Sequence, residues 1–217
     1  MEHSGTDHRS QWSVKGKLIS RRSWLLAGLA IPLSRAWAEP RLEVSFDGDS
    51  VHVATPGLHF LTGSALKRLE NADTVVFLSQ ITLFSDNFAT PIRRPVQERL
   101  VVSYAIWERR FAVAIPGGPA PRVEGLTDTQ AEDWCIRNLA VNALGLAPDR
   151  RFWLKFELRT APRKDTPALI NDSGISVLKV IDILSRRPRP DEPSWTLTTG
   201  PLRLSDLPRT VREKRTF

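Results

Sequence analysis

Cysteine and histidine are scarce in this chain, which limits the chemistry that it can carry. Cys135 is the only cysteine, so no internal disulfide can form. Four histidines occur in 217 residues, and only His52 and His59 lie beyond residue 38. No cysteine or further histidine stands at ligand spacing from that pair, so we predict no metal site and no cofactor. With no histidine near it in sequence, Cys135 is expected to be a buried, inert thiol.

The signatures of common enzymes are missing as well. The sequence contains no Gly-x-Ser-x-Gly elbow, no glycine-rich phosphate loop and no dinucleotide fingerprint. Asp172 beside Ser173 suggests a hydrolytic site, but residues 171–174 are more typical of a loop and helix cap. We therefore predict no catalytic residue, and a hydrolase is the least favoured function.

Long hydrophobic runs are also lacking, and the apolar segment Trp24–Leu33 is too short for a membrane span. Its ten residues compare with about twenty for a helix that crosses a bilayer. It follows a basic segment with an arginine pair and precedes a small-residue cleavage pattern, so residues 1–38 are interpreted as a twin-arginine signal peptide. An ordinary secretion signal is the alternative, because Trp24 stands where twin-arginine signals usually have phenylalanine after the arginine pair. The predicted recognition residues are Ser20, Arg21, Arg22, Trp24 and Leu25, with Ala36 and Ala38 at the cleavage site.

Beyond the predicted signal peptide, basic residues only slightly outnumber acidic ones. Residues 1–38 hold six of the 31 basic and two of the 24 acidic residues, which leaves 25 against 22, a net charge of +3. Such a balance argues against nucleic-acid binding, which needs a concentrated basic face. The expected product is one exported, periplasmic domain with no transmembrane span after cleavage near Ala38, about 179 residues long.

Alternating apolar residues and turn signals predict seven strands in the remaining chain. Residues 47–49 and 107–109 are expected to be the turns of two hairpins. The third strand is apolar on both faces and should be covered on both, whereas the sixth alternates and should leave one face in water. The predicted strands are residues 41–46, 50–54, 73–85, 99–106, 110–115, 152–159 and 195–199.

Helical periodicity predicts helices over residues 61–72, 127–145 and 173–185, although a strand also fits the last segment. Thr127 and Gln130 have the spacing of a capping box. The order of elements predicts an α+β domain over residues 39–200, with a mainly antiparallel sheet of six to seven strands and two to three packed helices. A β-sandwich with decorating helices is the alternative. Residues 201–217 are predicted to be a basic, mobile tail.

The segment Arg99–Phe111 resembles the arginine-flanked strand, turn and strand of an uncharacterised family of exported bacterial proteins, defined only as a domain of unknown function. The resemblance covers about residues 41–200, because the flanking helices and strands follow in the same order. It implies an envelope protein without assigned catalytic residues, and some members are similar in gene setting to partners of membrane sensor kinases.

Arginine and tryptophan around the second hairpin give the one positive indication of function. This composition is typical of protein-contact hot spots, although a solvated strand face is the simpler explanation. We expect a non-enzymatic binding or interaction module of the cell envelope, whose partner is a membrane or periplasmic protein. The alternative is a carrier of an apolar ligand or lipid, which requires a cavity of a few hundred Å³. The candidate contact residues are Arg99, Trp107, Arg109 and Arg110.

Overall fold

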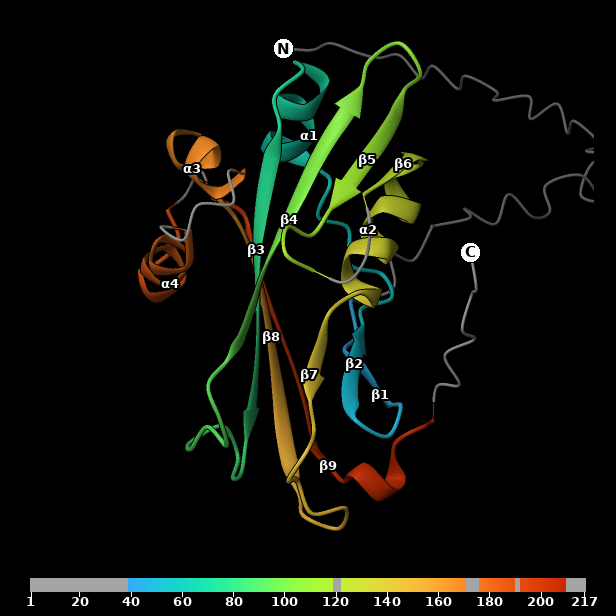
Figure 1. Ribbon diagram of the computed structural model, residues 1–217, viewed down its shortest axis with the longest axis vertical. Helices are drawn as coiled ribbons and strands as arrows, with labels where there is room; N and C mark the ends of the chain where they lie inside the picture. Colours follow the sequence, from blue (N-terminus) through green and yellow to red (C-terminus); the bar gives the residue numbers. More distant parts are fainter. Residues whose placement is uncertain (1–38, 119–121, 171–175, 190–191, 210–217) are drawn as a thin grey trace, which may run out of the picture. The chain divides into compact units, whose positions relative to one another are not determined.

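The computed structural model describes residues 39–118, 122–170, 176–189 and 192–209, which belong to one compact unit (Figure 1). These residues form a six-stranded and a three-stranded antiparallel sheet with four α-helices, so the α+β class is confirmed. The proposed signal peptide, residues 171–175 with Asp172, and the last eight residues lie outside the described ranges.

Nine strands, rather than six or seven, are present in the described ranges. They are β1 (Glu43–Phe46), β2 (Ser50–Ala54), β3 (Val75–Phe84), β4 (Val96–Ala105), β5 (Arg110–Ala114), β6 (Val123–Leu126), β7 (Ala140–Asn142), β8 (Phe152–Thr160) and β9 (Ser194–Leu202). The helices are α1 (Gly63–Glu70), α2 (Asp128–Arg137), α3 (Thr166–Ile170) and α4 (Ser176–Ser185), with short 3-10 helices at Arg163–Asp165 and Leu204–Asp206. The short strands β6 and β7 and the short helix α3 are the elements that the sequence does not predict.

The large sheet has the strand order β6-β5-β4-β3-β8-β9, and the small sheet has the order β1-β2-β7. Both predicted hairpins are confirmed, because β1 pairs with β2 and β4 pairs with β5, each in antiparallel register. β3 lies between β4 and β8, and nine of its ten residues are buried. The expectation that both faces of this strand are covered is therefore also confirmed.

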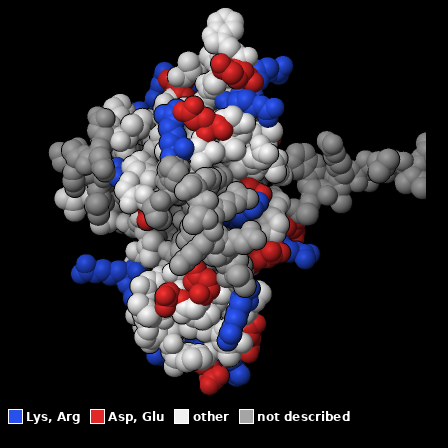
Figure 2. Space-filling view, turned by 45° about the vertical axis from the view of Figure 1, so that its right-hand side comes forward, with Lys and Arg blue, Asp and Glu red and all other residues white. Residues whose placement is uncertain are grey.

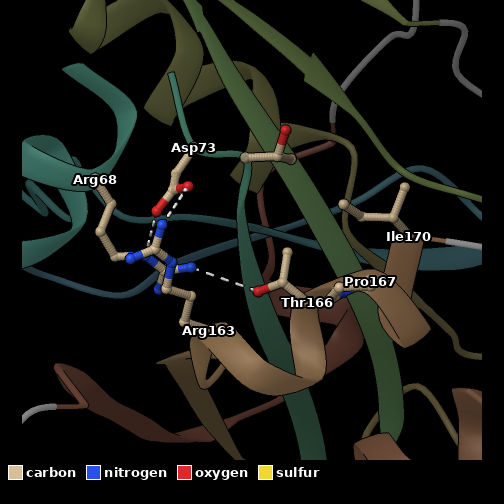
Figure 3. A pocket seen from close by; sticks show the side chains of 7 residues that line it. Arg68, Asp73, Arg163, Thr166, Pro167 and Ile170 are labelled. Atoms are coloured by element: carbon tan, nitrogen blue, oxygen red, sulfur yellow. Dashed lines mark hydrogen bonds and ion pairs between the residues drawn. The ribbon is translucent and has the colours of Figure 1, made fainter. Parts of the chain in front are cut away.

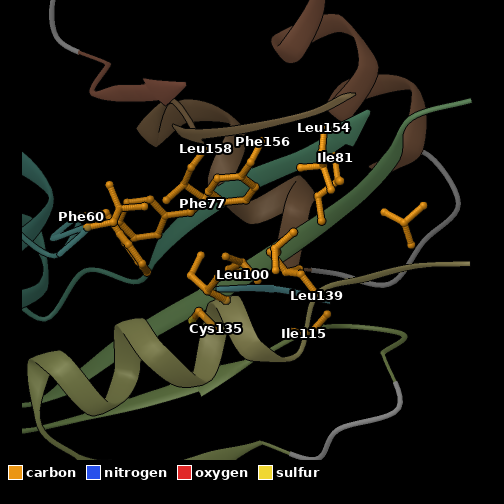
Figure 4. Close-up of a cluster of buried hydrophobic side chains, with 14 of the residues drawn as sticks. Phe60, Phe77, Ile81, Leu100, Ile115, Cys135, Leu139, Leu154, Phe156 and Leu158 are labelled. Atoms are coloured by element: carbon orange, nitrogen blue, oxygen red, sulfur yellow. The ribbon is translucent and has the colours of Figure 1, made fainter. Parts of the chain in front are cut away.

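The main core lies on one face of the large sheet, which we call the inner face. Phe77 of β3 and Phe156 of β8 are fully buried there, together with residues of α1, α2 and the small sheet (Figure 4). The ring of Phe60 packs edge-on against that of Phe77, with 4.8 Å between their centroids. Each such side chain contributes about 1.5–3 kcal/mol when it leaves water, so this layer stabilises the whole domain.

The opposite, outer face is covered in part by α3 and α4. Val76 and Leu78 of β3 pack against Leu169 of α3 and Val180 and Ile183 of α4. The helices thus lie on the other side of the sheet from α1 and α2 (Figure 1). This arrangement corrects the prediction that β8 leaves its second face entirely in water, because Arg159 on that face is buried.

Helix α2 is shorter than predicted, because it ends at Arg137 rather than near residue 145. The capping box of Thr127 and Gln130 is confirmed by both of its hydrogen bonds. At the other end, the Asn138 side chain donates a hydrogen bond to the Trp134 carbonyl, and the chain then extends to pair β7 with β2. The apolar periodicity beyond residue 137 therefore belongs to a strand and its flanks.

Helix α4 confirms the helical interpretation of the segment that begins near residue 173. Ile183 is fully buried on its inward side, whereas Ile181 is 43% exposed. No helix in the described ranges is long and apolar enough to cross a membrane.

The prediction of a mobile tail from residue 201 is wrong for residues 201–209, which are ordered. β9 extends to Leu202, and Leu204 in the following 3-10 helix is buried. The amide of Phe46 donates a 3.0 Å hydrogen bond to the Pro208 carbonyl, which ties this segment to β1. Residues 201–209 therefore belong to the domain.

Candidate functional site

The tip of the β4–β5 hairpin is the most exposed apolar feature among the predicted contact residues. Trp107 is 94% exposed, and its neighbour Ile106 is 46% exposed. The turn closes where Ala105 pairs with Arg110, and Arg109 adopts a left-handed backbone conformation with φ of 52°. Trp107, Arg109 and Arg110 therefore share one tip, as the sequence predicts. We call these residues, with Ile106, the hairpin tip.

A hollow of about 690 Å³ lies beside the hairpin tip, over β4, β5 and β6. Its wall combines the aromatic side chains of Tyr104 and Phe111, whose ring centroids are 4.8 Å apart, with charged residues of both signs. Arg122 and Glu124 of this wall form an ion pair with a distance of 2.9 Å between Nε and Oε1. Basic and acidic side chains also alternate at the upper end of Figure 2. The hairpin therefore offers a mixed charged and aromatic surface.

Arg99 lies away from the hairpin tip, in the middle of β4. Its Nη1 donates a 2.8 Å hydrogen bond to the carbonyl of Leu169, near the end of α3. The structure thus brings together three of the four predicted contact residues and separates Arg99 from them. Arg93 behaves similarly, since its Nη2 donates a 2.9 Å hydrogen bond to the Leu144 carbonyl. Both arginines connect parts of the fold.

The two histidines each contact one carboxylate in separate places. His52 Nε2 lies 2.8 Å from Asp47 Oδ2 in the first hairpin, and His59 Nδ1 lies 2.9 Å from Glu132 Oε2. Burial works against ionisation of Asp47, but hydrogen bonds from His52 and the Ser50 amide hold its pKa below the usual value. Within the described ranges, no three histidine, cysteine or carboxylate side chains gather as metal ligands.

Glu132 is a buried carboxylate whose role the sequence analysis missed. Its Oε1 accepts hydrogen bonds from the backbone amides of Phe60, at 2.6 Å, and Leu61, at 2.7 Å. Glu132 lies three and four residues before Cys135 and Ile136, on the buried side of α2. A charged residue at such a position signals a buried partner, because an unpaired charge in a core is costly. The helical spacing of Glu132 from the buried residues Cys135 and Ile136 is the sequence signal that points to its buried role.

Cys135 lies in the main core and is fully buried, as predicted. Burial, followed by the nearby negative charge of Glu132, raises the pKa of the thiol far above its usual value. The thiolate, which is the reactive form of cysteine, is therefore disfavoured at neutral pH.

The hairpin tip and its hollow thus provide an exposed indole, two exposed guanidinium groups and an ion pair, which suit contact with another molecule. No protein-family model, no curated protein and no solved structure matches this chain.

Proposed function

We propose that this protein is a non-enzymatic interaction module of the cell envelope, exported by its twin-arginine signal. In this proposal, the hairpin tip contacts a membrane or periplasmic protein. The observation that carries the proposal is the 94% exposure of Trp107 at the end of a well-packed hairpin. An indole that enters a partner's pocket removes about 200 Å² from water, which corresponds to about 5 kcal/mol before the costs of association.

The hairpin below the tip is held firmly, which lowers the cost of binding. Phe111 and Val113 of β5 are buried in the main core, and β5 is paired on both sides, with β4 and β6. The Tyr104 ring packs against Phe111 directly beneath the turn. A contact surface that is ordered before binding loses less conformational entropy when the complex forms.

The charges at the tip indicate the chemistry of the partner. Arg109 and Arg110 are both exposed and follow Trp107 closely in sequence. Glu108 is the one acidic residue in the turn, so the tip has a net positive charge. An apolar pocket with acidic side chains at its rim complements this arrangement. The partner is therefore expected to present carboxylates around a site for the indole.

A carrier of an apolar ligand has less support from the structure. The inner face of the large sheet is filled by side chains such as Phe60, Phe77 and Phe156. The hollow of about 690 Å³ is lined by charged residues, among them Arg110 and Glu124, which an apolar ligand would remove from water without offering them a hydrogen bond.

In-cell photo-crosslinking tests the contact. A photoreactive amino acid in place of Ile106 should form an adduct with one envelope protein, and Trp107→Ala should reduce its yield about tenfold, as expected for a hot spot. Leu178→Ala is the matched control, because Leu178 of α4 is also a large exposed side chain, at 74%. Both variants should keep the free energy of unfolding within about 1 kcal/mol. An adduct that survives Trp107→Ala, or no adduct at all, contradicts the proposed contact.

The export step has a separate test. Replacing Arg21 and Arg22 by lysine should retain the precursor in the cytoplasm, because the twin-arginine route reads the arginine pair as an address. Fractionation of cells that express the full chain measures the result. Export that continues unimpaired would contradict the twin-arginine assignment without affecting the hairpin contact.

A further inference from the structure

A second hollow, of about 330 Å³, lies between the end of α1 and the start of α3, far in sequence from the hairpin tip. Figure 3 shows its lining side chains, with those of Arg68 and Arg163 reaching toward each other beneath Asp73. Pro167 and Ile170 of α3 form an apolar wall beside them. We call this space the arginine hollow.

The arginine hollow holds more positive than negative charge. Arg163 Nη2 lies 3.0 Å from Asp73 Oδ1, whereas Arg68 Nε lies 3.8 Å from Asp73 Oδ2. Two guanidinium groups thus share one carboxylate, which leaves an excess of one positive charge among its lining residues. That charge is available to an anion, and guanidinium groups bind carboxylate and phosphate oxygens in two-pronged geometry.

Arg68 is incompletely satisfied by its neighbours. Its Nη1 and Nη2 donate long hydrogen bonds of 3.4 Å to the Ala161 carbonyl and 3.5 Å to Thr166 Oγ1. Its Nε atom is buried and has no hydrogen-bond partner among the described residues. Burial and the positive charge of Arg163 lower the pKa of Arg68, against the opposing effect of Asp73. An additional anion would offset both the repulsion and the missing hydrogen bonds.

Arg163 is suited to respond to a ligand. Its side chain is 76% exposed, so it can change rotamer without disturbing the core. Arg68, in contrast, is held by α1 and is only 19% exposed. The pair therefore combines one fixed and one movable guanidinium group in the lining of the same space, close together beneath Asp73 (Figure 3).

We propose that the arginine hollow binds a small molecule with an oxyanion, either a carboxylate or a phosphoryl group. The oxyanion lies between the guanidinium groups of Arg68 and Arg163, and the apolar part of the molecule lies against Pro167 and Ile170. This site is separate from the hairpin tip and does not depend on the proposed partner contact.

Isothermal titration calorimetry of the full chain with inorganic phosphate, butyl phosphate and butyrate tests this proposal. We expect a dissociation constant of about 1 mM or lower for at least one butyl probe, with weaker binding of inorganic phosphate because it lacks the apolar part. Tighter binding of butyl phosphate than butyrate identifies a phosphoryl ligand, and the reverse order identifies a carboxylate. No heat of binding for any probe up to about 20 mM overturns the proposal.

Two variants and a control separate a built site from general attraction of anions. Arg163→Gln should weaken binding about tenfold, while Lys164→Gln, which removes an exposed charge beside the hollow but not in its lining, should leave it unchanged. Asp73→Asn should strengthen binding, because it removes the carboxylate that competes with the ligand. Equal effects of Arg163→Gln and Lys164→Gln show an adventitious ion only and overturn the proposal. If Asp73→Asn fails to fold, the comparison at positions 163 and 164 still decides.

Discussion

Replacing Glu132 by alanine should be among the most destabilising single changes in α2. The Glu132 carboxylate joins α2 to the segment that precedes α1, because its Oε1 accepts from the amides of Phe60 and Leu61. Both amides are buried, so water cannot readily replace the lost acceptor. Alanine would leave two donors without partners in the core.

The magnitude follows from these two hydrogen bonds. A buried donor left unsatisfied costs about 1–3 kcal/mol, so Glu132→Ala should reduce the free energy of unfolding by about 2–6 kcal/mol. A domain of this kind is stable by only about 5–15 kcal/mol in total. Glu132→Gln keeps an oxygen that can accept from both amides and loses the charge, so a smaller reduction of about 1–2 kcal/mol is expected.

Urea unfolding of the full chain, followed by tryptophan fluorescence, measures these differences. His59→Ala is a control for the other carboxylate oxygen, and it should cost less than about 1 kcal/mol because the His59 side chain is 42% exposed. From most to least stable, the expected order is wild type, His59→Ala, Glu132→Gln and Glu132→Ala. A cost for Glu132→Ala below about 1 kcal/mol, or one equal to that of Glu132→Gln, would refute the role assigned to the two amides.

Three further outcomes test other buried groups. Cys135 should resist a thiol reagent in the native protein and react after denaturation, so prompt labelling of folded protein would contradict its burial. Burial raises the pKa of Glu98, so its contribution to stability is present below about pH 4 and is lost as the pH rises through the folded-state value. Glu98→Gln should therefore increase the free energy of unfolding at pH 7 but not at pH 3, and a difference independent of pH would count against this. Arg159→Ala should cost about 2–4 kcal/mol and speed amide hydrogen exchange in α4, since Arg159 donates to the carbonyls of Ile183 and Arg186; unchanged exchange would show that apolar contacts alone hold the helix.

Local signals in the sequence predicted most of the sheet correctly. The two hairpins and the alternating strand β8 depend on residues close to one another in the chain, so pattern and turn chemistry identify them. The prediction of one helix over residues 127–145 is wrong for its carboxy-terminal half. Apolar residues keep their helical spacing past Asn138, although the helix itself ends at Arg137. There, pairing of Val141 with Val51 of β2 overrides the helical pattern. That pairing joins segments 90 residues apart, which a local pattern cannot show.

The same limit applies to the candidate sites. The sequence alone predicts the hairpin tip, because Trp107 and Arg109 lie within one turn. The contact between Glu132 and Phe60 spans 72 residues, and that between Arg163 and Asp73 spans 90. Neither pair has a local motif that links its members. Only the folded chain brings these groups together.

Some arginines of this protein donate hydrogen bonds to backbone carbonyls within the fold, and others are exposed at the hairpin tip. Only the exposed group is open to a partner. Arg99 and Arg159 donate to the carbonyls of Leu169 and Ile183, and so tie α3 and α4 to the outer face of the sheet. Arginine content alone therefore overstates the contact surface, because these two serve the fold. The arginine hollow is built on the same docked α3, which follows the 3-10 helix that begins at Arg163. Its occupation should stabilise α3 on the sheet, since a ligand that binds only the docked arrangement shifts the equilibrium toward it.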